Sequence, residues 1–223
     1  MILLDDNFGV LPEAFREGQR IVNGMSDILK LFLTRILYVA LLIVAVAAVQ
    51  AGFPLAPKHS ALLSMFAVGL PTLALAAWAR PAPHAGSVLG PVFRFALPAA
   101  CALTLVGFVV YVGYFIVGMH AIPASGPERL PAAEAAQAVA QTALTIVSVL
   151  CGLLLLVFVE PPTPAWTGGD VLSGDRRPTI LAALLLLVFA VILAVPPLRE
   201  SFELAALAPT DYAALGLATS AWR

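Results

Sequence analysis

The sequence predicts an all-α polytopic membrane protein, built as a six-helix transmembrane bundle, and its composition is the first reason. The chain has 223 residues, of which 61% are hydrophobic and only 11% charged, and its mean hydropathy is +0.98. A soluble domain carries about 25% charged residues, so these charges are too few to cover a surface in water. A formal net charge of −1 offers no basic patch, which excludes nucleic acid as a partner. The lipid bilayer is therefore the expected partner of most of the surface.

Six hydrophobic segments account for the bundle, and they differ in length. A helix needs about 17–25 apolar residues to cross a bilayer; four segments meet this clearly, a fifth is near the lower limit and the last is short. In the last segment, only about 21 Å of helix follows Pro209. Either a kinked helix begins near Phe202 or the chain stops before this helix reaches its natural end. The predicted spans are residues 28–49, 60–78, 95–117, 135–159, 179–195 and 202–222.

The basic residues set the orientation of these spans, because Lys and Arg favour cytoplasmic loops. With the N-terminus inside, nine of the twelve Lys and Arg residues fall on the cytoplasmic side and three on the outer side. An odd number of spans would break this separation. The sequence therefore predicts a multi-pass protein of the plasma membrane with both termini in the cytoplasm.

The N-terminal region is predicted to begin with the stub of a missing α/β domain. Residues 1–11 open with a short apolar run followed by acidic residues, which is typical of one buried strand entering a turn. Residues 12–27 continue into the first span and are predicted to form a cytoplasmic stalk helix. The alternative is an amphipathic helix lying on the inner leaflet. An apolar stripe follows one face of this helix: Phe15, Val22, Met25, Leu29 and Phe32.

Polar residues inside the spans are the candidates for an ion pathway. A charge within a span is a functional candidate by default, and a proline that removes a backbone hydrogen bond often marks a pathway. The alternatives are a guanidinium that reaches the cytoplasmic surface, a simple kink, and hydrogen bonds between helices. The candidates are Thr34, Arg35, Tyr38, Ser64, Pro71 and Thr72, whereas Thr104, Thr142, Thr145 and Ser148 are expected to bond between helices.

The sequence assigns neither catalytic residues nor metal ligands. The three histidines, His59, His84 and His120, fall in separate predicted loops, away from one another and from a carboxylate on a shared helix face. The cation ligands, if the chain has any, therefore stay unassigned.

Three motifs resemble cation-translocating P-type ATPases of the HAD superfamily. The run LLDDNF at 3–8 resembles the end of that family's phosphorylation domain, EGQRIVNG at 17–24 resembles the entry to its fifth membrane helix, and GLPTLAL at 69–75 resembles its sixth. The resemblance implies that the six spans are the family's fifth to tenth membrane helices. The motif residues are Asp5, Asp6, Asn7, Gly18, Arg20, Asn23, Gly69, Leu70 and Pro71.

The resemblance implies the membrane half of an ion pump without the half that hydrolyses ATP. Full-length members use ATP and Mg²⁺ and form an aspartyl phosphate, but the phosphorylated Asp motif, the nucleotide domain and the actuator domain are not in this sequence. The chain is expected to bind no cofactor and to be inactive alone. Its expected partners are the missing ATPase half, supplied in cis or in trans, and a transported cation.

The resemblance favours a divalent cation without fixing which one. In register, the ligand positions of calcium-pump-like members fall here on Ile36, Val39, Ser64 and Val68. Two other interpretations stay open: a stand-alone six-span permease or assembly subunit without ATPase function, and the inactive product of a decayed gene. The coding sequence upstream of Met1 distinguishes the first of these from a pump fragment.

Overall fold

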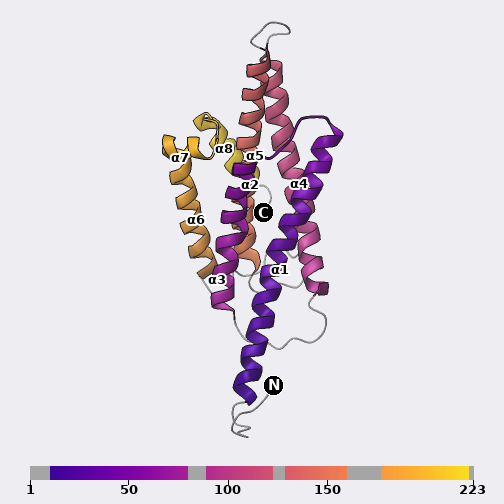
Figure 1. Cartoon of the computed structure of the whole chain (residues 1–223), viewed down its shortest axis with the longest axis vertical. Coiled ribbons are helices and arrows are strands. Elements are labelled where there is room, and N and C mark those ends of the chain that lie inside the picture. The colour runs from indigo at the N-terminus through magenta and orange to yellow at the C-terminus, as the bar shows by residue number, and fades with distance from the viewer. Residues whose placement is uncertain (1–10, 80–88, 123–128, 160–176, 221–223) are drawn as a thin grey trace.

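The computed structural model describes residues 11–79, 89–122, 129–159 and 177–220. Every regular element in these residues is a helix, which confirms the all-α class. The long helices run alternately up and down one bundle, and the N-terminal part of α1 extends beyond the others (Figure 1). The strand and turn predicted for residues 1–11 lie almost wholly outside the described residues.

The first helix is longer than a bilayer requires. α1 runs unbroken from Leu11 to Ala48, 38 residues or about 57 Å, because no proline follows Pro12 and its glycines only weaken a helix. Residues 12–27 and the first span therefore form one helix, while the cytoplasmic position of its first part stays a prediction.

The second membrane segment is a helix with a π-helical insertion. α2 (Pro57–Ser64) is followed by the π-helix η2 (Met65–Gly69) and by α3 (Leu70–Trp78). The Leu70 N–H donates to the carbonyl of Met65, five residues earlier, as a π-helix requires. Pro71 is the second residue of α3 and has no N–H, so no backbone hydrogen bond runs from it to the preceding turn.

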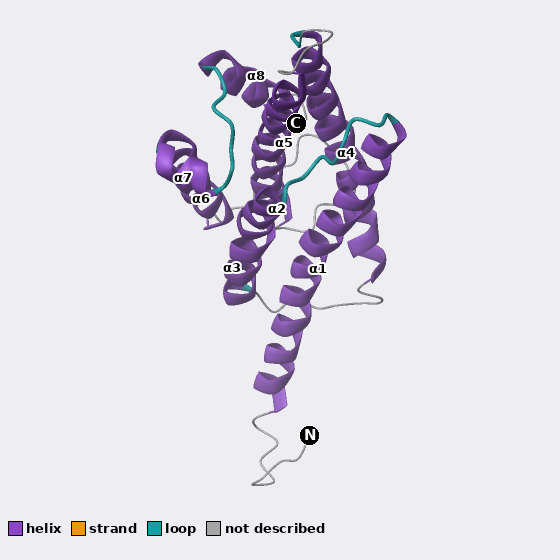
Figure 2. Cartoon of the chain, turned by 45° about the horizontal axis from the view of Figure 1, so that its top comes forward, coloured by secondary structure: helices purple, strands orange, loops and turns teal. Residues whose placement is uncertain are grey.

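The centre of the bundle is α5. α4 (Leu89–His120) and α5 (Arg129–Val159) form an antiparallel pair, and α5 also contacts α1, α2, η2, α6 and α8. Of its most hydrophobic 18-residue window, 78% is buried, against 22–39% for the other four candidate spans. Figure 2 shows α5 behind α1 and α2, with α4 alongside. The core therefore lies around α5, and the other helices expose a wide apolar face.

The region after α6 differs from the prediction. α6 (Arg177–Ala194) is followed by the short helix α7 (Pro196–Ser201), a non-helical stretch at 202–208 and α8 (Pro209–Ser220). No continuous helix covers 202–222, because the helix begins only at Pro209; its 12 residues measure about 18 Å. Among the described residues, five helices are long and apolar enough to cross a membrane. The sixth crossing therefore stays a prediction.

At the end of the bundle opposite the N-terminus, side chains of α4 and α5 hold the connection between α1 and α2. The Tyr111 hydroxyl donates to the carbonyl of Ala51 at 2.8 Å, and Gln141 Nε2 donates to the carbonyl of Phe53 at 2.7 Å. Gly52, between these two carbonyls, has φ +80°, a conformation that favours glycine. The connection is thus fixed by both sequence and packing.

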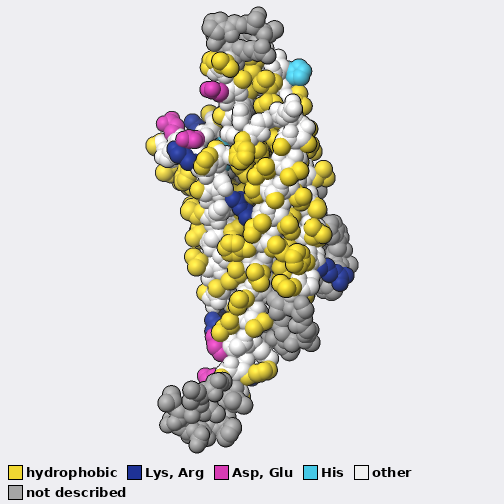
Figure 3. Space-filling model, turned by 45° about the vertical axis from the view of Figure 1, so that its right-hand side comes forward, with side chains coloured by type: hydrophobic (Ala, Val, Ile, Leu, Met, Phe, Trp, Pro, Cys, Tyr) yellow, Lys and Arg dark blue, Asp and Glu magenta, His cyan; other side chains and the backbone are white. Residues whose placement is uncertain are grey.

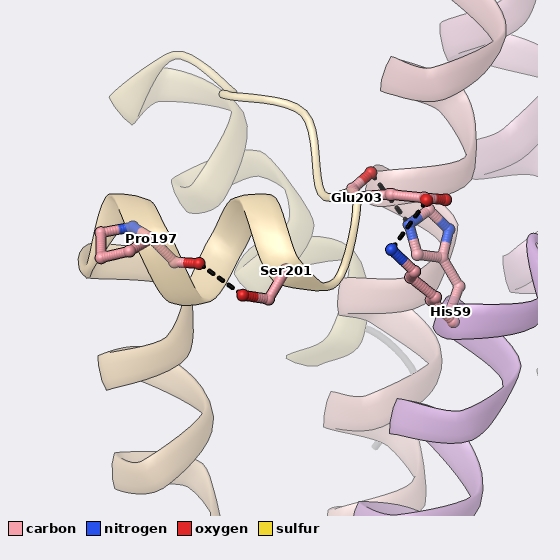
Figure 4. Close-up of polar contacts among 5 residues, drawn as sticks. His59, Pro197, Ser201 and Glu203 are labelled. Carbon is pink, nitrogen blue, oxygen red and sulfur yellow. Dashed lines mark hydrogen bonds and ion pairs between the residues drawn. The ribbon is translucent and has the colours of Figure 1, made fainter.

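The non-helical stretch after α7 is fastened at the same end. The ring of His59 bonds through Nε2 to the carbonyl of Glu203 at 3.2 Å (Figure 4), and Lys58 Nζ lies 2.8 Å from Glu203 Oε1. The hydrogen bond from Lys58 lowers the pKa of the Glu203 carboxyl. His59 was predicted in a loop, but it is buried in the first turn of α2. The backbone carbonyl that it bonds explains why a histidine is tolerated there.

Candidate functional site

A small cavity lies between α1, the second membrane segment, α4 and α5, and three of the six predicted pathway residues line it. Its volume is about 30 Å³, room for about one or two water molecules. The polar lining consists of Thr34, Arg35 and Tyr38 of α1 and Ser148 of α5. The rest of the lining is Leu31, Leu63, Ala67, Val68, Leu103, Gly152 and Leu155.

Arg35 is bound to the second membrane segment. Its Nη2 donates to the carbonyl oxygen and the Oγ of Ser60 at 3.2 and 3.1 Å, and to Ser64 Oγ at 3.0 Å. These partners belong to α2, so the guanidinium does not extend along α1 toward its N-terminal end. Arg35 lies about 20 Å before the end of α1 at Ala48. Figure 3 shows basic side chains at mid-height within a largely hydrophobic surface.

A hydroxyl pair joins α1 to α5 at the cavity. The Tyr38 hydroxyl and Ser148 Oγ lie 2.5 Å apart in a buried hydrogen bond. Thr34 Oγ1, one turn away, donates to the carbonyl of Lys30 at 2.7 Å. A hydroxyl oxygen that donates one hydrogen bond keeps lone pairs free to accept another contact. These three oxygens are therefore the chain's own acceptor groups at the cavity.

The residues expected to bond between helices divide into two groups. Ser148 does so through Tyr38, and Thr142 Oγ1 accepts from the backbone N–H of Ala205 at 2.9 Å. Thr104 and Thr145 instead donate to carbonyls four residues earlier in their own helices. For these two the prediction was wrong, because a helical threonine reaches its own backbone more easily than a neighbour.

The remaining pathway candidates follow the second membrane segment. Ser64 joins the group by accepting from Arg35, and its own hydroxyl donates to the carbonyl of Ser60 at 2.8 Å. Pro71 and Thr72 are buried in α3 but do not line the cavity; Thr72 Oγ1 donates to the carbonyl of Gly69 at 3.0 Å. Ser60 was missed by the sequence analysis, although its spacing of four from Ser64 places both on one helix face.

The family-motif residues lie away from the cavity. Asp5, Asp6 and Asn7 are outside the described residues. In α1, Gly18 is exposed, Asn23 is half-buried, and Arg20 pairs with Glu17 at 3.7 Å and donates to the carbonyl of Ala77 at 3.1 Å. Gly24 allows the two segments to approach closely, because a Cβ at this position would lie only 2.9 Å from Ala79 Cβ. The motif at 17–24 thus joins α1 to the end of α3, whereas Gly69 and Leu70 form the junction of η2 and α3.

The cavity offers hydroxyl oxygens and one guanidinium. Hard cations such as Ca²⁺ prefer about six to eight oxygen ligands, usually with carboxylates among them. Within the described ranges no three His, Cys, Asp or Glu side chains are grouped so that they could hold a metal ion. The cavity residues could therefore supply only part of a cation site, with other ligands completing it.

Comparison with known proteins gives relatives of one kind. The chain is 26% identical over 216 residues to the calcium-transporting ATPase CtpE of Mycolicibacterium smegmatis. It is 25% identical over 214 residues to the calcium-transporting ATPases CtpE of Mycobacterium bovis and of Mycobacterium tuberculosis. No protein-family model matches the chain. The alignments cover 92% of this chain and 24% of each relative, so the chain spans about a quarter of the length of the curated relatives it matches.

The fold and the comparisons agree on the class of protein. Long apolar helices make the chain a membrane protein, and the similarity extends over nearly all of it. The chain is a distant homologue of calcium-transporting ATPases, and it fits the C-terminal membrane portion of a P-type ATPase. The family resemblance predicted from the motifs is thereby confirmed.

Proposed function

We propose that this chain forms part of the ion pathway of an ATP-driven divalent-cation transporter, and that ATP is hydrolysed by a portion of the transporter outside this sequence. The observation that carries the proposal is the similarity to calcium-transporting ATPases over 92% of the chain. A cavity at the junction of four membrane segments supports it, because four polar side chains gather there in an otherwise apolar bundle.

In this proposal the oxygens of Thr34, Tyr38 and Ser148 contribute to a transient cation site. Ca²⁺ is the first cargo to test, since it is the ion named for the relatives. The π-helix η2 contributes Ala67 and Val68 to the cavity wall, and π-helical insertions are frequent at functional sites. Pro71 has no N–H to give to the carbonyl of Ala67 four residues earlier. The backbone at this point can therefore rearrange with less loss of hydrogen bonding than in a regular helix.

The first experiment is to sequence the DNA upstream of the codon for Met1. The proposal expects an open frame that encodes a phosphorylation domain and a nucleotide domain. The protein encoded by both parts together, placed in membrane vesicles, should accumulate radioactive Ca²⁺ when ATP is added. The chain alone should form no phosphoenzyme. A promoter in place of that frame, or Mg²⁺-dependent ATP hydrolysis by the purified chain, would contradict the proposal.

Two tyrosines give a matched test of the pathway. Tyr38→Phe removes the hydroxyl at the cavity, whereas Tyr111→Phe removes one that bonds the carbonyl of Ala51 at the far end of the bundle. We expect Tyr38→Phe to raise the Ca²⁺ concentration needed for half-maximal transport by about tenfold, the effect of one lost ligand interaction. Tyr111→Phe should leave this concentration unchanged. Equal values in the two variants would remove Tyr38 from the pathway.

A further inference from the structure

One nitrogen of the Arg35 guanidinium lacks a partner in the described part of the chain. The hydrogen bonds from Arg35 to Ser60 and Ser64 all start at Nη2. Nη1 is buried and has no hydrogen-bond partner among the described residues. A guanidinium stays charged in proteins and only donates hydrogen bonds. Buried donors are normally satisfied, so Nη1 requires an acceptor that these residues do not supply.

The guanidinium borders the cavity between the four membrane segments. Arg35 lines this cavity together with Tyr38 and Ser148, and its charge interacts electrostatically with Tyr38. Since Nη2 is engaged by α2, Nη1 is the nitrogen available to a molecule held in the cavity. The cavity volume of about 30 Å³ admits one or two particles of the size of a water molecule. The acceptor that Nη1 requires is therefore small.

The Tyr38–Ser148 pair supplies a second donor. In a hydrogen bond between two hydroxyls, one donates and the other keeps its own hydrogen for a further acceptor; here either oxygen could be the donor. The hydrogen of Thr34 is already used, because Thr34 Oγ1 donates to the carbonyl of Lys30. The cavity thus presents the N–H groups of Nη1 and one hydroxyl hydrogen. Such donors favour a negatively charged occupant, because charge-assisted hydrogen bonds are the stronger ones.

The charge of Arg35 has no carboxylate to balance it within these helices. Acidic residues are absent from the apolar parts of the first three membrane segments, residues 28–48, 57–78 and 89–120. Glu134 lies in the second turn of α5, and Asp27 is paired with Lys30 at 2.7 Å. The contacts of Arg35 in α2 are hydroxyl and carbonyl oxygens without a net charge. An uncompensated charge among apolar side chains is costly, so a bound anion would stabilise the folded chain.

We propose that the cavity binds one small monovalent anion, chloride in the cell, between Arg35 Nη1 and the free hydroxyl hydrogen of the Tyr38–Ser148 pair. A water molecule would satisfy the donors and leave the charge, whereas a halide ion of little greater size does both. The cavity volume excludes sulfate, phosphate and lipid headgroups. The proposal does not rest on the proposed function, because it concerns the chain with no cation in the cavity. In that state the anion neutralises the guanidinium.

Retention of radioactive chloride by the purified full chain tests the site directly. The chain is held in a non-ionic detergent, and sodium gluconate keeps the ionic strength constant. We expect saturable retention of one chloride per chain. Unlabelled chloride or bromide should displace it, whereas gluconate and sulfate should leave it in place. This measurement needs only the unmodified chain, so it does not depend on whether a variant folds.

Thermal unfolding, followed by the cooperative loss of helix in circular dichroism, tests which residues hold the anion. A ligand that binds only the folded chain raises Tm; at about ten times the dissociation constant of chloride, the rise over gluconate alone should be about 3–6 °C. Arg35→Gln should abolish this chloride-dependent rise, whatever its own Tm. Arg94→Gln removes a basic residue from an exposed position on α4 and should keep the rise. Tyr38→Phe combined with Ser148→Ala removes both hydroxyls and should raise the dissociation constant about tenfold.

Three results would overturn the proposal. Without saturable retention of chloride, the cavity would hold only water. Displacement of chloride by sulfate would place the anion at an open surface instead of the cavity. A chloride-dependent rise in Tm that survives in Arg35→Gln would place it away from Arg35. None of these measurements uses ATP or Ca²⁺, so a transport assay that fails beside clear chloride binding would count against the proposed function alone.

Discussion

The close contact between α5 and η2 makes Gly152→Ala a strong test of the packing around the cavity. A Cβ on Gly152 would lie 2.5 Å from Ala67 Cβ and 3.3 Å from Ala67 Cα. Carbon atoms in ordinary contact are about 3.5–4.0 Å apart, so the two segments would have to separate by about 1 Å. Overpacking of this kind costs about 1–3 kcal/mol. We expect Gly152→Ala to lower the free energy of unfolding by this amount.

The assay measures thermal unfolding in detergent. Unfolding is monitored through the reaction of a fluorogenic maleimide with Cys151, which is buried in the folded chain. Cys101 is exposed and is replaced by serine in all variants. For a chain of this size, 1 kcal/mol corresponds to about 2–4 °C in Tm. Gly113→Ala in α4 is the matched control, because a Cβ there meets nothing within 4 Å. Its Tm should stay close to that of the unmodified chain.

A second substitution locates the clash. In an Ala67→Gly background the opposing Cβ is absent, so Gly152→Ala should cost much less than it does with Ala67 in place. Residues in direct contact show such coupling in double-mutant cycles. The reasoning is refuted if Gly152→Ala and Gly113→Ala unfold at the same temperature, or if the cost of Gly152→Ala is unchanged by Ala67→Gly.

Three further outcomes can be measured by the same assay. Tyr38→Phe should lower the free energy of unfolding by about 0.6–1.7 kcal/mol. Ser148→Ala in the same chain should lower it little further, because both substitutions remove the same hydrogen bond. Additive losses would contradict this pairing. Gly52→Ala should cost about 1–2 kcal/mol, since φ is +80° there; an unchanged Tm would show that the connection relaxes. Lys58 lowers the pKa of Glu203, so the stabilisation from this carboxylate is present above its unfolded pKa and is lost as pH falls through the lower folded value. Glu203→Gln should remove that part of the acid dependence of Tm, and an acid profile identical to that of the unmodified chain would count against the ion pair.

Much of the helical framework follows from local properties of the sequence. The first five predicted spans fall, to within one residue, inside a described helix or the segment α2–η2–α3, because crossing a bilayer requires a minimum length of apolar chain. The continuity of α1 from Leu11 to Ala48 was equally predictable, since nothing after Pro12 breaks it. The motifs also indicated the resemblance to P-type ATPases, because their order along the chain is specific.

Composition, hydropathy and the order of the motifs therefore establish the class of protein, the positions of five long helices and the presence of a charge inside the first of them. Tertiary structure alone decided what that charge meets. Ser148 lies 110 residues after Tyr38, and Ser60 lies 25 after Arg35. Hydropathy indicates that a helix is buried, but it does not specify which other helix packs against it. That choice depends on close approaches such as Gly152 on Ala67, on the π-helix that turns the second segment, and on the late start of the last helix at Pro209. These are relations between segments far apart in the chain, and no local pattern encodes them.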